Sequence, residues 1–446
     1  MISAIGLVGG LALLIVLTVR GMSILVAAPL CATLVAATAG IAMLPPLAAD
    51  GAPDLMTAYM GGFTSFMGDW FPMFLLGAIF GKLMEESGAA DAVARQVVDR
   101  FGPGRAVLAV VIACAVLTYG GVSVFIVAFG VHPMAVGLFR EADLPRRFIP
   151  GALTFGSVTF TMTSAGSPEI QNLIPMQYLG TTPLAGWQAS LPVALVMAIV
   201  GHVWLGRMVR QAVAAGERFE ARDGDAEPVP PHELPTFVAA LSPLVVVLGV
   251  FLLTSGTIRG ASLLDLGKWS LVVALGAGCL VVYALGGARG RAGAPRALSD
   301  GAIGAVIAIA NTCAVVGFGA VARETSAFTA ALEALQGLPG DPLIGAAIAV
   351  TVVAGLTGSA SGGQSIALPL VAPIYLDMGV NPDEMHRVVA IASGALDSLP
   401  HNGYVVTTIR VICGETHASS YGAVGRLTVV VPLFGLALAL AIFAVL

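Results

Sequence analysis

The sequence predicts an all-α polytopic membrane protein with two inverted-topology repeats, each containing a re-entrant hairpin and a broken helix. Three observations predict this class. The 446-residue chain is 57% hydrophobic and only 11% charged, whereas soluble chains carry roughly 25% charged residues. Two long apolar segments are interrupted in the middle by proline, glycine and polar residues. The same order of elements recurs in the two halves of the chain.

The composition predicts ten membrane-spanning segments, because apolar runs of about 20 residues recur along the chain. Two of them, 148–182 and 386–413, are broken. The continuous segments are 2–19, 22–44, 62–83, 188–206, 236–256, 268–286, 301–322 and 427–446. The first has no basic leader typical of a signal peptide, so we expect it to remain as a helix.

Two further apolar stretches, 105–139 and 342–376, are each too long for a single span. Both have glycine- and serine-rich centres, at 118–123 and 357–363. Two half-length helices that meet at a tip inside the membrane would account for this pattern. We therefore expect two re-entrant hairpins.

The two broken segments carry polar side chains at the point where the helix must stop. Gly166 and Pro168 lie in the first, and Pro400 and Gly403 lie in the second. Proline removes a backbone donor, and glycine permits backbone angles outside the helical range. Broken backbone inside a bilayer is tolerated only where protein or a water-filled cavity satisfies the freed groups. We therefore expect both breaks to surround a small solute.

An offset of 238 residues aligns the two halves of the chain, as internal repeats of secondary transporters do. The matched pairs are Gly81 with Gly319, Glu86 with Glu324, Gly102 with Gly340, Gly120 with Gly358 and Ser123 with Ser361; after a short slip, Ala152 matches Ala390 and Gly156 matches Gly394. The expected organisation is N-terminal scaffold helices 1–60, first repeat 61–206, cytoplasmic linker 207–235, further scaffold helices 236–300 and second repeat 301–446. Amphipathic arms at 88–101 and 325–337 are expected to lie in the membrane interface.

Lys and Arg in short loops set the orientation of such a protein. Under these spans one side, which we place in the cytoplasm, carries Arg20, Lys82, Arg95, Arg100, Arg105, Arg140, Arg146, Arg147, Arg207, Arg210, Arg289, Arg291 and Arg296. The corresponding segments of the second repeat are acidic and carry Glu324, Glu333, Asp341, Asp377, Asp383 and Glu384. The repeats are therefore expected to be inverted, with both termini outside the cytoplasm.

The hairpin tips and the breaks supply the candidate site. Half-helix N-termini present unpaired N–H groups and a positive dipole end, which suit a carboxylate, whereas exposed carbonyl groups suit a small cation. The candidate substrate-binding residues are Gly120, Gly121, Ser123, Thr163, Ser164, Ser167, Gly358, Ser359, Ser361, Gln364, His401 and Asn402. The candidate coupling-ion residues are Asp397, Glu169, Asn172 and Ser398. The alternative for any single hydroxyl is close helix packing.

The titratable candidates have more than one interpretation. Asp397 and Glu169 are the first candidates for ion coupling, because burial disfavours a charged carboxylate. Glu169 has the alternative of lying in water at the outer mouth. His401 is a coupling proton site, a substrate hydrogen-bond donor or a brace for the break.

Other classes of chemistry find no support in the sequence. The segment GAIFGK (77–82) is one residue short of a phosphate-binding loop and lacks its Ser or Thr. Metalloprotease, paired-cysteine and nucleophile-elbow motifs are missing, and so is a basic aromatic surface for nucleic acid. The five cysteines stand singly in apolar runs and are expected to fill the core. We expect no cofactor, no metal and no catalysis.

Two segments, LGAIFGKLMEESGAADAVARQVVDRFGPGRA (76–106) and ASGALDSLPHNGYVVTTIRVICGETH (392–417), resemble the gluconate permease family of the larger ion-transporter superfamily. The resemblance extends from about Gly61 to the C-terminus. It implies proton-driven uptake of a hydroxylated or short-chain carboxylate by a homodimer whose hairpin-bearing domain slides against a static scaffold, an elevator-type mechanism. The first break departs from the proline- and histidine-rich run of sugar-acid permeases, which leaves smaller acids such as 3-hydroxybutyrate, or di- and tricarboxylates, open.

The expected function is a symporter in the inner membrane for an organic anion with H⁺ or Na⁺. A Na⁺-coupled di- or tricarboxylate symporter and a passive anion channel are the alternatives. A membrane-embedded enzyme has only His401 and the carboxylates in its favour.

Overall fold

The computed structural model describes residues 2–20, 22–101, 103–222, 230, 233–256, 265–330 and 341–446, and this part of the chain is helical. A single isolated β-bridge, between Ala42 and Asp54, interrupts the helical pattern of the described residues. Six described helices are long and apolar enough to cross a membrane, and further apolar helices are shorter. The prediction of an all-α membrane protein is confirmed.

The helices of the first half are α1 (Ile2–Val19), α2 (Ile24–Ala39), α3 (Leu55–Glu86), α4 (Ala89–Phe101), α5 (Ala106–Tyr119), α6 (Val124–Glu141), α7 (Ile149–Thr154), α8 (Ile170–Leu179) and α9 (Trp187–Ala214). Those of the second half are α10 (Phe237–Thr254), α11 (Ser270–Leu285), α12 (Gly287–Arg323), α14 (Pro342–Thr357), α15 (Ala360–Asp377), α16 (Pro382–Ser393), α17 (Gly403–Val406), α18 (His417–Gly425) and α19 (Val431–Phe443).

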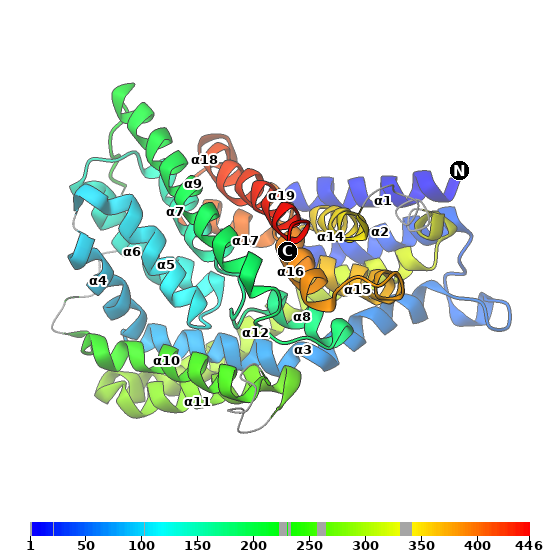
Figure 1. The fold of residues 1–446 in the computed structure, drawn as a ribbon, viewed down its shortest axis with the longest axis horizontal. Helices are drawn as coiled ribbons and strands as arrows, with labels where there is room; N and C mark the ends of the chain where they lie inside the picture. The colour runs from blue at the N-terminus through cyan, green and yellow to red at the C-terminus, as the bar shows by residue number, and fades with distance from the viewer. Residues whose placement is uncertain are drawn as a thin grey trace.

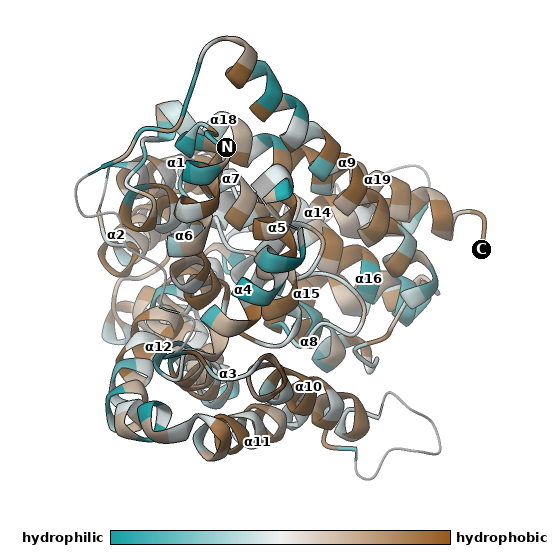
Figure 2. Ribbon diagram, turned by 90° about the vertical axis from the view of Figure 1, so that its left-hand side faces the viewer, coloured by the Kyte–Doolittle hydropathy of each residue, from teal (hydrophilic) through white to brown (hydrophobic). Residues whose placement is uncertain are grey.

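Two long helices, α3 and α12, pack against each other and form one wall of the molecule together with α10 and α11 (Figure 1). They have 32 and 37 residues, which at 1.5 Å per residue exceeds the roughly 30 Å of a bilayer core. Figure 2 shows that α10 and α11 are hydrophobic over most of their surface, as helices in contact with lipid are. Both long helices continue beyond the predicted spans. Hydropathy identifies the part of a helix that lies in the membrane, and it does not identify the residue at which the helix ends.

Two pairs of helices, α5–α6 and α14–α15, are joined by the predicted tips. The turns contain Gly121 at φ +89° and Gly358 at φ +60°, backbone angles that favour glycine. The N-cap position of α6 is Ser123, whereas the N-cap position of α15 is Ser359 and not Ser361. The alignment of Ser123 with Ser361 is therefore shifted by two residues at the hairpin tips.

Each hairpin packs an isoleucine into a glycine of one long helix. A Cβ added to Gly81 of α3 would lie 2.6 Å from Cδ1 of Ile126, on α6. A Cβ added to Gly319 of α12 would lie 2.3 Å from Cδ1 of Ile366, on α15. These two glycines are a pair in the sequence alignment, and the structure gives them the same packing role.

The two predicted breaks lie between α7 and α8 and between α16 and α17. Residues 160–169 and 394–402 leave the helical path there, with Gly166 at φ +80° in the first break. A π-helical turn lies beside each break, at Phe155–Thr159 and Thr407–Ile412. The expectation that Gly403 breaks the helix is wrong, because Gly403 is the first residue of α17 and the cap before it is Asn402.

The segment after α9 is more ordered than the expected linker. The helix continues to Ala214, and Glu217 accepts two bonds from Arg147, at 2.6 and 2.8 Å. Arg147 thereby holds the pKa of the Glu217 carboxyl below its usual range. Arg222 then donates to the carboxylate of Glu415 at 2.7 Å. Residues 223–229 of the linker, and residues 331–337 of the second predicted arm, lie outside the described part of the chain, whereas the first arm is helix α4.

Candidate functional site

One buried arginine of the second repeat binds the first break. Arg387 of α16 is fully buried, and its guanidinium donates to the carbonyl groups of the first break and of the segment after α8. The acceptors are the carbonyl oxygens of Thr163, Pro183 (3.2 Å) and Ala185 (2.9 and 3.0 Å). No described carboxylate lies within ion-pair distance of Arg387, and every described hydrogen-bond acceptor of its guanidinium is a neutral oxygen.

Asn172 and His386 complete this cluster. The side-chain oxygen of Asn172 accepts from Arg387 at 3.0 Å and lies 3.0 Å from Nε2 of His386. Its amide nitrogen donates to the carbonyl oxygens of Ser167 and Pro183, both at 3.0 Å. Asn172 therefore has partners on both sides of its amide, an arrangement that suits a brace between the two repeats.

Gln364 of α15 links the second hairpin to α8 and α16, the two helices that adjoin the breaks. Its amide nitrogen donates to the carbonyl oxygen of Gln171 at 3.0 Å and to Oγ of Ser393 at 3.1 Å. The side chain is fully buried, and its oxygen has no hydrogen-bond partner among the described residues. A buried carbonyl oxygen of this kind is available to a solute donor or a cation.

The second hairpin tip lies against the second break. Asn402 donates to the carbonyl oxygen of Gly358 at 2.9 Å. A Cβ at Gly358 would lie 2.7 Å from Nε2 of His401, so the imidazole packs directly on this glycine. His401 is buried, and this nitrogen has no partner among the described residues.

The first hairpin tip lies against the first break. The hydroxyl of Tyr119 donates to the carbonyl oxygen of Ala165. A Cβ at Gly121 would lie 3.6 Å from the ring of Pro168. The tip also contacts the wall, because a Cβ at Gly120 would lie 2.8 Å from the side chain of Leu244.

The hairpins also reach across to the other repeat. Phe125 of α6 packs edge-on against Tyr404 of α17, with ring centroids 5.2 Å apart. The two breaks touch each other, since a Cβ at Gly394 would lie 3.1 Å from the methyl group of Thr163. Both tips and both breaks therefore belong to one centre.

The helix N-termini at this centre differ between the repeats. Ser359 accepts from the N–H of Gly362 at 3.1 Å, and Asn402 accepts from that of Val405 at 2.8 Å, so the second repeat caps its own helices. In the first repeat, the side chains of Ser123 and Glu169 make no such cap at α6 and α8. The two uncapped N-termini are the ones that retain N–H groups for an anion.

Two predicted carboxylates lie at the breaks without a described cation within ion-pair distance. Asp397 is buried and accepts from Oγ of Ser398 at 2.8 Å. Glu169 is partly exposed at the N-terminus of α8. A carboxylate at such a position is unfavourable unless a cation compensates its charge, and otherwise the protonated acid is favoured.

Of the remaining predicted hydroxyl groups, some are bonded within the protein and others have no described partner and could bind a solute. Ser164 donates to the carbonyl oxygen of Phe160 at 2.6 Å, as a packing residue does. The hydroxyl of Ser167 is buried and has no partner among the described residues. Ser359 and Ser361 lie 3.4 Å apart, hydroxyl to hydroxyl. In the described part of the chain, no group of three or more metal-binding side chains is found.

Sequence reasoning missed Arg387 and His386. An arginine beside a histidine at the start of the second broken segment was the available signal. Their partners lie more than 200 residues earlier in the chain, so this local signal could not identify the residues that they contact.

Comparison with known proteins places the chain among transporters. It is 34% identical over 453 residues to the uncharacterized transporter YxjC of Bacillus subtilis, covering 94% of each chain. It is 24% identical over 372 residues to the high-affinity gluconate transporter of Escherichia coli, covering 78% of this chain and 79% of that protein.

The fold is also similar to that of a solved transporter. The YdaH transporter of Alcanivorax borkumensis, described as having an unusual topology, aligns with a TM-score of 0.59 over 99% of this chain and 98% of that chain, at 18% identity. The family model for GntP family permeases matches residues 2–402. Members of this family are transporters and not enzymes, and the chain belongs to the GntP permease family.

Proposed function

We propose that this permease is a secondary active symporter that takes up a small hydroxylated carboxylate together with a proton. The observation that carries the proposal is the meeting of two hairpin tips and two broken helices at one buried polar centre. Half-helices that end at a shared point inside the membrane are the architecture in which secondary transporters bind solute and ion. The similarity to a gluconate transporter supports a hydroxy acid as the substrate class.

The carboxylate of the substrate would bind on the side of the first repeat. The uncapped N-termini of α6 and α8 supply N–H groups there. Arg387 adds a buried positive charge, because its partners are neutral oxygens. The partnerless hydroxyl of Ser167 and the side-chain oxygen of Gln364 are available to the hydroxyl group of the substrate.

Proton coupling follows from the position of Glu169 at the N-terminus of α8. An ionised Glu169 would repel a substrate carboxylate at the same N–H groups. At about 5 Å and an effective dielectric constant of about 20, this repulsion is about 3 kcal/mol. Substrate binding would therefore favour the protonated glutamic acid, and protonation would favour substrate to the same extent. Asp397 is the second candidate for this role.

An elevator-type movement is the mechanism we propose for alternating access. The hairpins contact the wall of long helices through apolar contacts, Ile126 on Gly81 and Ile366 on Gly319. Polar bonds instead join the second hairpin to the breaks, as at Gln364. A body held together internally by polar bonds and externally by apolar packing is suited to move as a unit. A homodimer with both termini outside the cytoplasm remains part of the proposal.

Accumulation in proteoliposomes tests the proposal. The purified protein would be given labelled 3-hydroxybutyrate, gluconate and citrate, with an inward proton gradient and an inward sodium gradient imposed separately. We expect proton-driven accumulation of a hydroxy acid. The Glu169→Gln variant should lose accumulation but retain exchange of labelled for unlabelled substrate, because glutamine resembles the protonated acid. Glu141→Gln, at an exposed position on α6, is the matched control and should behave like the wild type.

Each other outcome identifies an alternative. Drive by sodium alone would contradict proton coupling and favour a Na⁺ symporter. Loss of coupling in Asp397→Asn but not in Glu169→Gln would assign proton binding to Asp397, in the second break. Flux that never exceeds the equilibrium concentration under either gradient would indicate a passive channel and refute the proposal.

A further inference from the structure

A cavity of about 290 Å³ lies outside the central site, between the wall and the second hairpin. Its walls come from α3, α8, α12 and α15, four helices from both halves of the chain. The volume is at the lower end of the range for small-molecule sites. The site described above makes no use of it.

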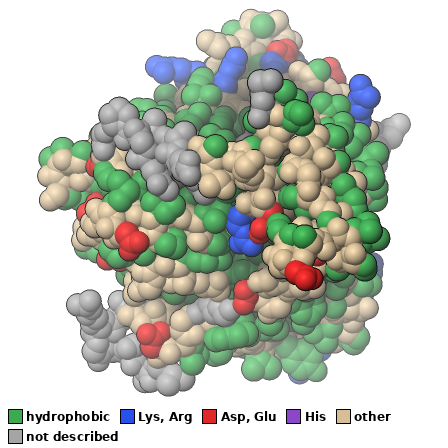
Figure 3. Space-filling model, turned by 90° about the vertical axis from the view of Figure 1, so that its right-hand side faces the viewer, with side chains coloured by type: hydrophobic (Ala, Val, Ile, Leu, Met, Phe, Trp, Pro, Cys, Tyr) green, Lys and Arg blue, Asp and Glu red, His purple; other side chains and the backbone are tan. Residues whose placement is uncertain are grey.

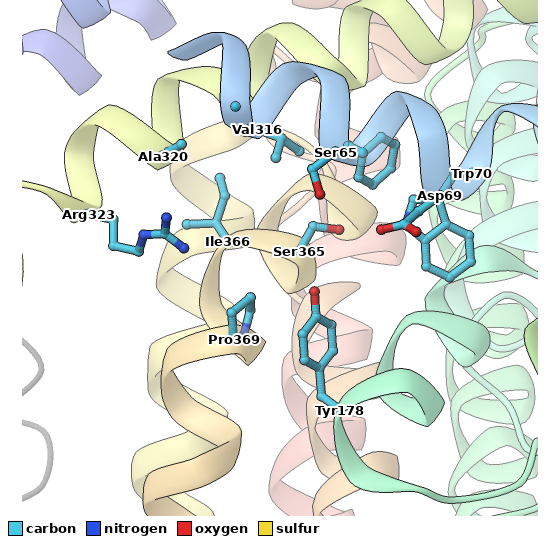
Figure 4. Close-up of a pocket in the computed structure, with 14 residues that line it drawn as sticks. Ser65, Asp69, Trp70, Tyr178, Val316, Ala320, Arg323, Ser365, Ile366 and Pro369 are labelled. Carbon is cyan, nitrogen blue, oxygen red and sulfur yellow. The ribbon is translucent and has the colours of Figure 1, made fainter. Parts of the chain in front are cut away.

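The cavity is polar where its helices converge. Figure 4 shows the hydroxyl groups of Ser65, Tyr178 and Ser365 and the carboxylate of Asp69 pointing toward the same space. The hydroxyl oxygen of Ser365 is shielded from solvent and has no hydrogen-bond partner among the described residues. A shielded hydroxyl without a partner, directed at a cavity, indicates a missing ligand or water.

One end of the cavity carries a cation. Arg323, the last residue of α12, projects toward it from beyond Ile366 (Figure 4). Its nearest described acidic partner is the adjacent Glu324, at 3.7 Å, and both side chains are partly exposed. The guanidinium therefore keeps donors free to bind a carboxylate in bidentate geometry.

Exposure indicates which end is the mouth. Arg323 and Ser65 are exposed, whereas Trp70 at the other end is buried. Figure 3 shows a basic group near the middle of one face of the molecule, with an acidic group directly beside it and further acidic groups below. Arg323 at the exposed end would attract a carboxylate at short range, and the neighbouring Glu324 offsets part of this attraction.

The inner end of the cavity is next to the central site. Ser365 directly follows Gln364, whose side chain bonds to Gln171 and Ser393 beside the two breaks. Successive residues of a helix point in directions about 100° apart. Helix α15 therefore presents one polar group to the cavity and the next to the centre.

We infer that this cavity is a second binding site, an outer chamber in which a short hydroxycarboxylate is held before it reaches the centre. Arg323 binds the carboxylate, and the hydroxyls of Ser365 and Tyr178, with the carboxylate of Asp69, bind the hydroxyl group of the ligand. This inference rests on the proposed function for the class of ligand. It adds a site that is separate from the hairpin tips and the breaks.

Thiol labelling of the purified, full-length protein tests the inference. Ser65→Cys places a thiol at the mouth, and Thr64→Cys is the matched control, because Thr64 is its exposed neighbour on α3 and does not line the cavity. Labelling by a maleimide would be measured with and without 3-hydroxybutyrate, gluconate or citrate. At a concentration about ten times the dissociation constant, a bound ligand should slow labelling of the first thiol about tenfold and leave the second unchanged.

Two further variants separate this site from the centre. Arg323→Gln should raise the ligand concentration that protects the thiol about tenfold or more, because a charge-assisted contact is lost. His401→Gln, or Glu169→Gln if the first is not monodisperse, alters the centre and should leave the protection intact. Protection that disappears in the central variant, or that survives Arg323→Gln unchanged, would overturn the inference.

The labelling experiment and the transport experiment can refute their two proposals independently. If the wild type accumulates a carboxylate in vesicles but the Ser65→Cys thiol is never protected, the outer chamber is refuted and the proposed function stands. If the thiol is protected but no carboxylate accumulates, the site exists and the symporter proposal is refuted.

Discussion

Replacing Arg387 by methionine should destabilise the protein, although it removes a buried charge. The guanidinium is the described partner of the carbonyl oxygens of Thr163 and Ala185, whereas Pro183 and Asn172 keep other bonds. Two buried acceptors would be left unsatisfied, each at about 1–3 kcal/mol. Relief of the buried charge offsets part of this cost. We expect a net loss of about 3 kcal/mol in the free energy of unfolding.

The measurement is a thermal melt of the purified protein, followed by size-exclusion chromatography. With an unfolding entropy of about 2.1 cal/mol/K per residue, a loss of this size lowers the melting temperature by about 3 °C. Arg387→Lys, which keeps the charge but loses the planar fork, should fall between the wild type and the methionine variant. Arg410→Met, at an exposed position on the same broken helix, is the control and should melt like the wild type. A methionine variant as stable as the wild type would refute the view that Arg387 braces the breaks.

Three further predictions concern the parts that position the site. Gly186→Ala should lower the melting temperature, because Gly186 has φ +61° and a Cβ there would lie 2.7 Å from Cβ of Arg387. Gly180→Ala should lower it less, because Gly180 has a similar φ of +64° but open space around it. Equal losses in the two variants would contradict this reasoning. Burial raises the pKa of Asp91 on α4 to about 6, above its unfolded value of about 3.9, so its ionisation costs stability as the pH rises through this range. Asp91→Asn should therefore raise the melting temperature at about pH 7.5 but not at about pH 4, and a gain at both would exclude ionisation as the cause. Glu415→Gln should lower the free energy of unfolding by about 3 kcal/mol, because it removes the carboxylate that pairs with the buried Arg146 and with Arg222. The measurement is chemical unfolding, and an unchanged denaturation midpoint would show that these ion pairs contribute no stability.

The sequence predicts the interruptions of this fold better than the ends of its helices. Glycine and proline act through the local backbone, so the tips at Gly121 and Gly358 and the break at Gly166 could be placed from local residues. Gly403 shows the limit of this reasoning, because the carboxamide of Asn402 caps a helix that starts at this glycine. A glycine is compatible with both outcomes, and the cap decides between them.

The helices were predicted too short because hydropathy follows the membrane and not the backbone. Helix α12 begins at Gly287, in a basic segment expected to be a loop, and α9 continues to Ala214. Charged residues with good helix propensity extend a helix into water at little cost. The first turn of α3 shows a local signal that was available, since Asp54 accepts from the N–H of Thr57 at 2.9 Å as an N-cap.

The residues of the candidate site could be named from the sequence, and both the location of the site and the roles of its residues remain predictions. Hydroxyls, amides and carboxylates near the breaks could be named because they stand beside glycine and proline. Whether a hydroxyl is available depends on partners that only the fold supplies. Ser164 has a carbonyl partner within its own break, whereas Ser167, three residues later, has none among the described residues.

The two repeats contribute different kinds of contact to the polar centre. In the second repeat, Ser359 and Asn402 occupy the N–H groups at their own helix ends, and Arg387 reaches across to hold the first break. In the first repeat, Ser123 and Glu169 leave those groups uncapped. The second repeat therefore has the contacts of a brace, and the first leaves helix N–H groups uncapped, which is where we propose that the anion binds. Because the only titratable residue among the four caps is Glu169, its ionised carboxylate and a substrate carboxylate would repel each other at one helix end. Protonation of Glu169 would remove this repulsion and so favour binding of the anion, which is the coupling we propose.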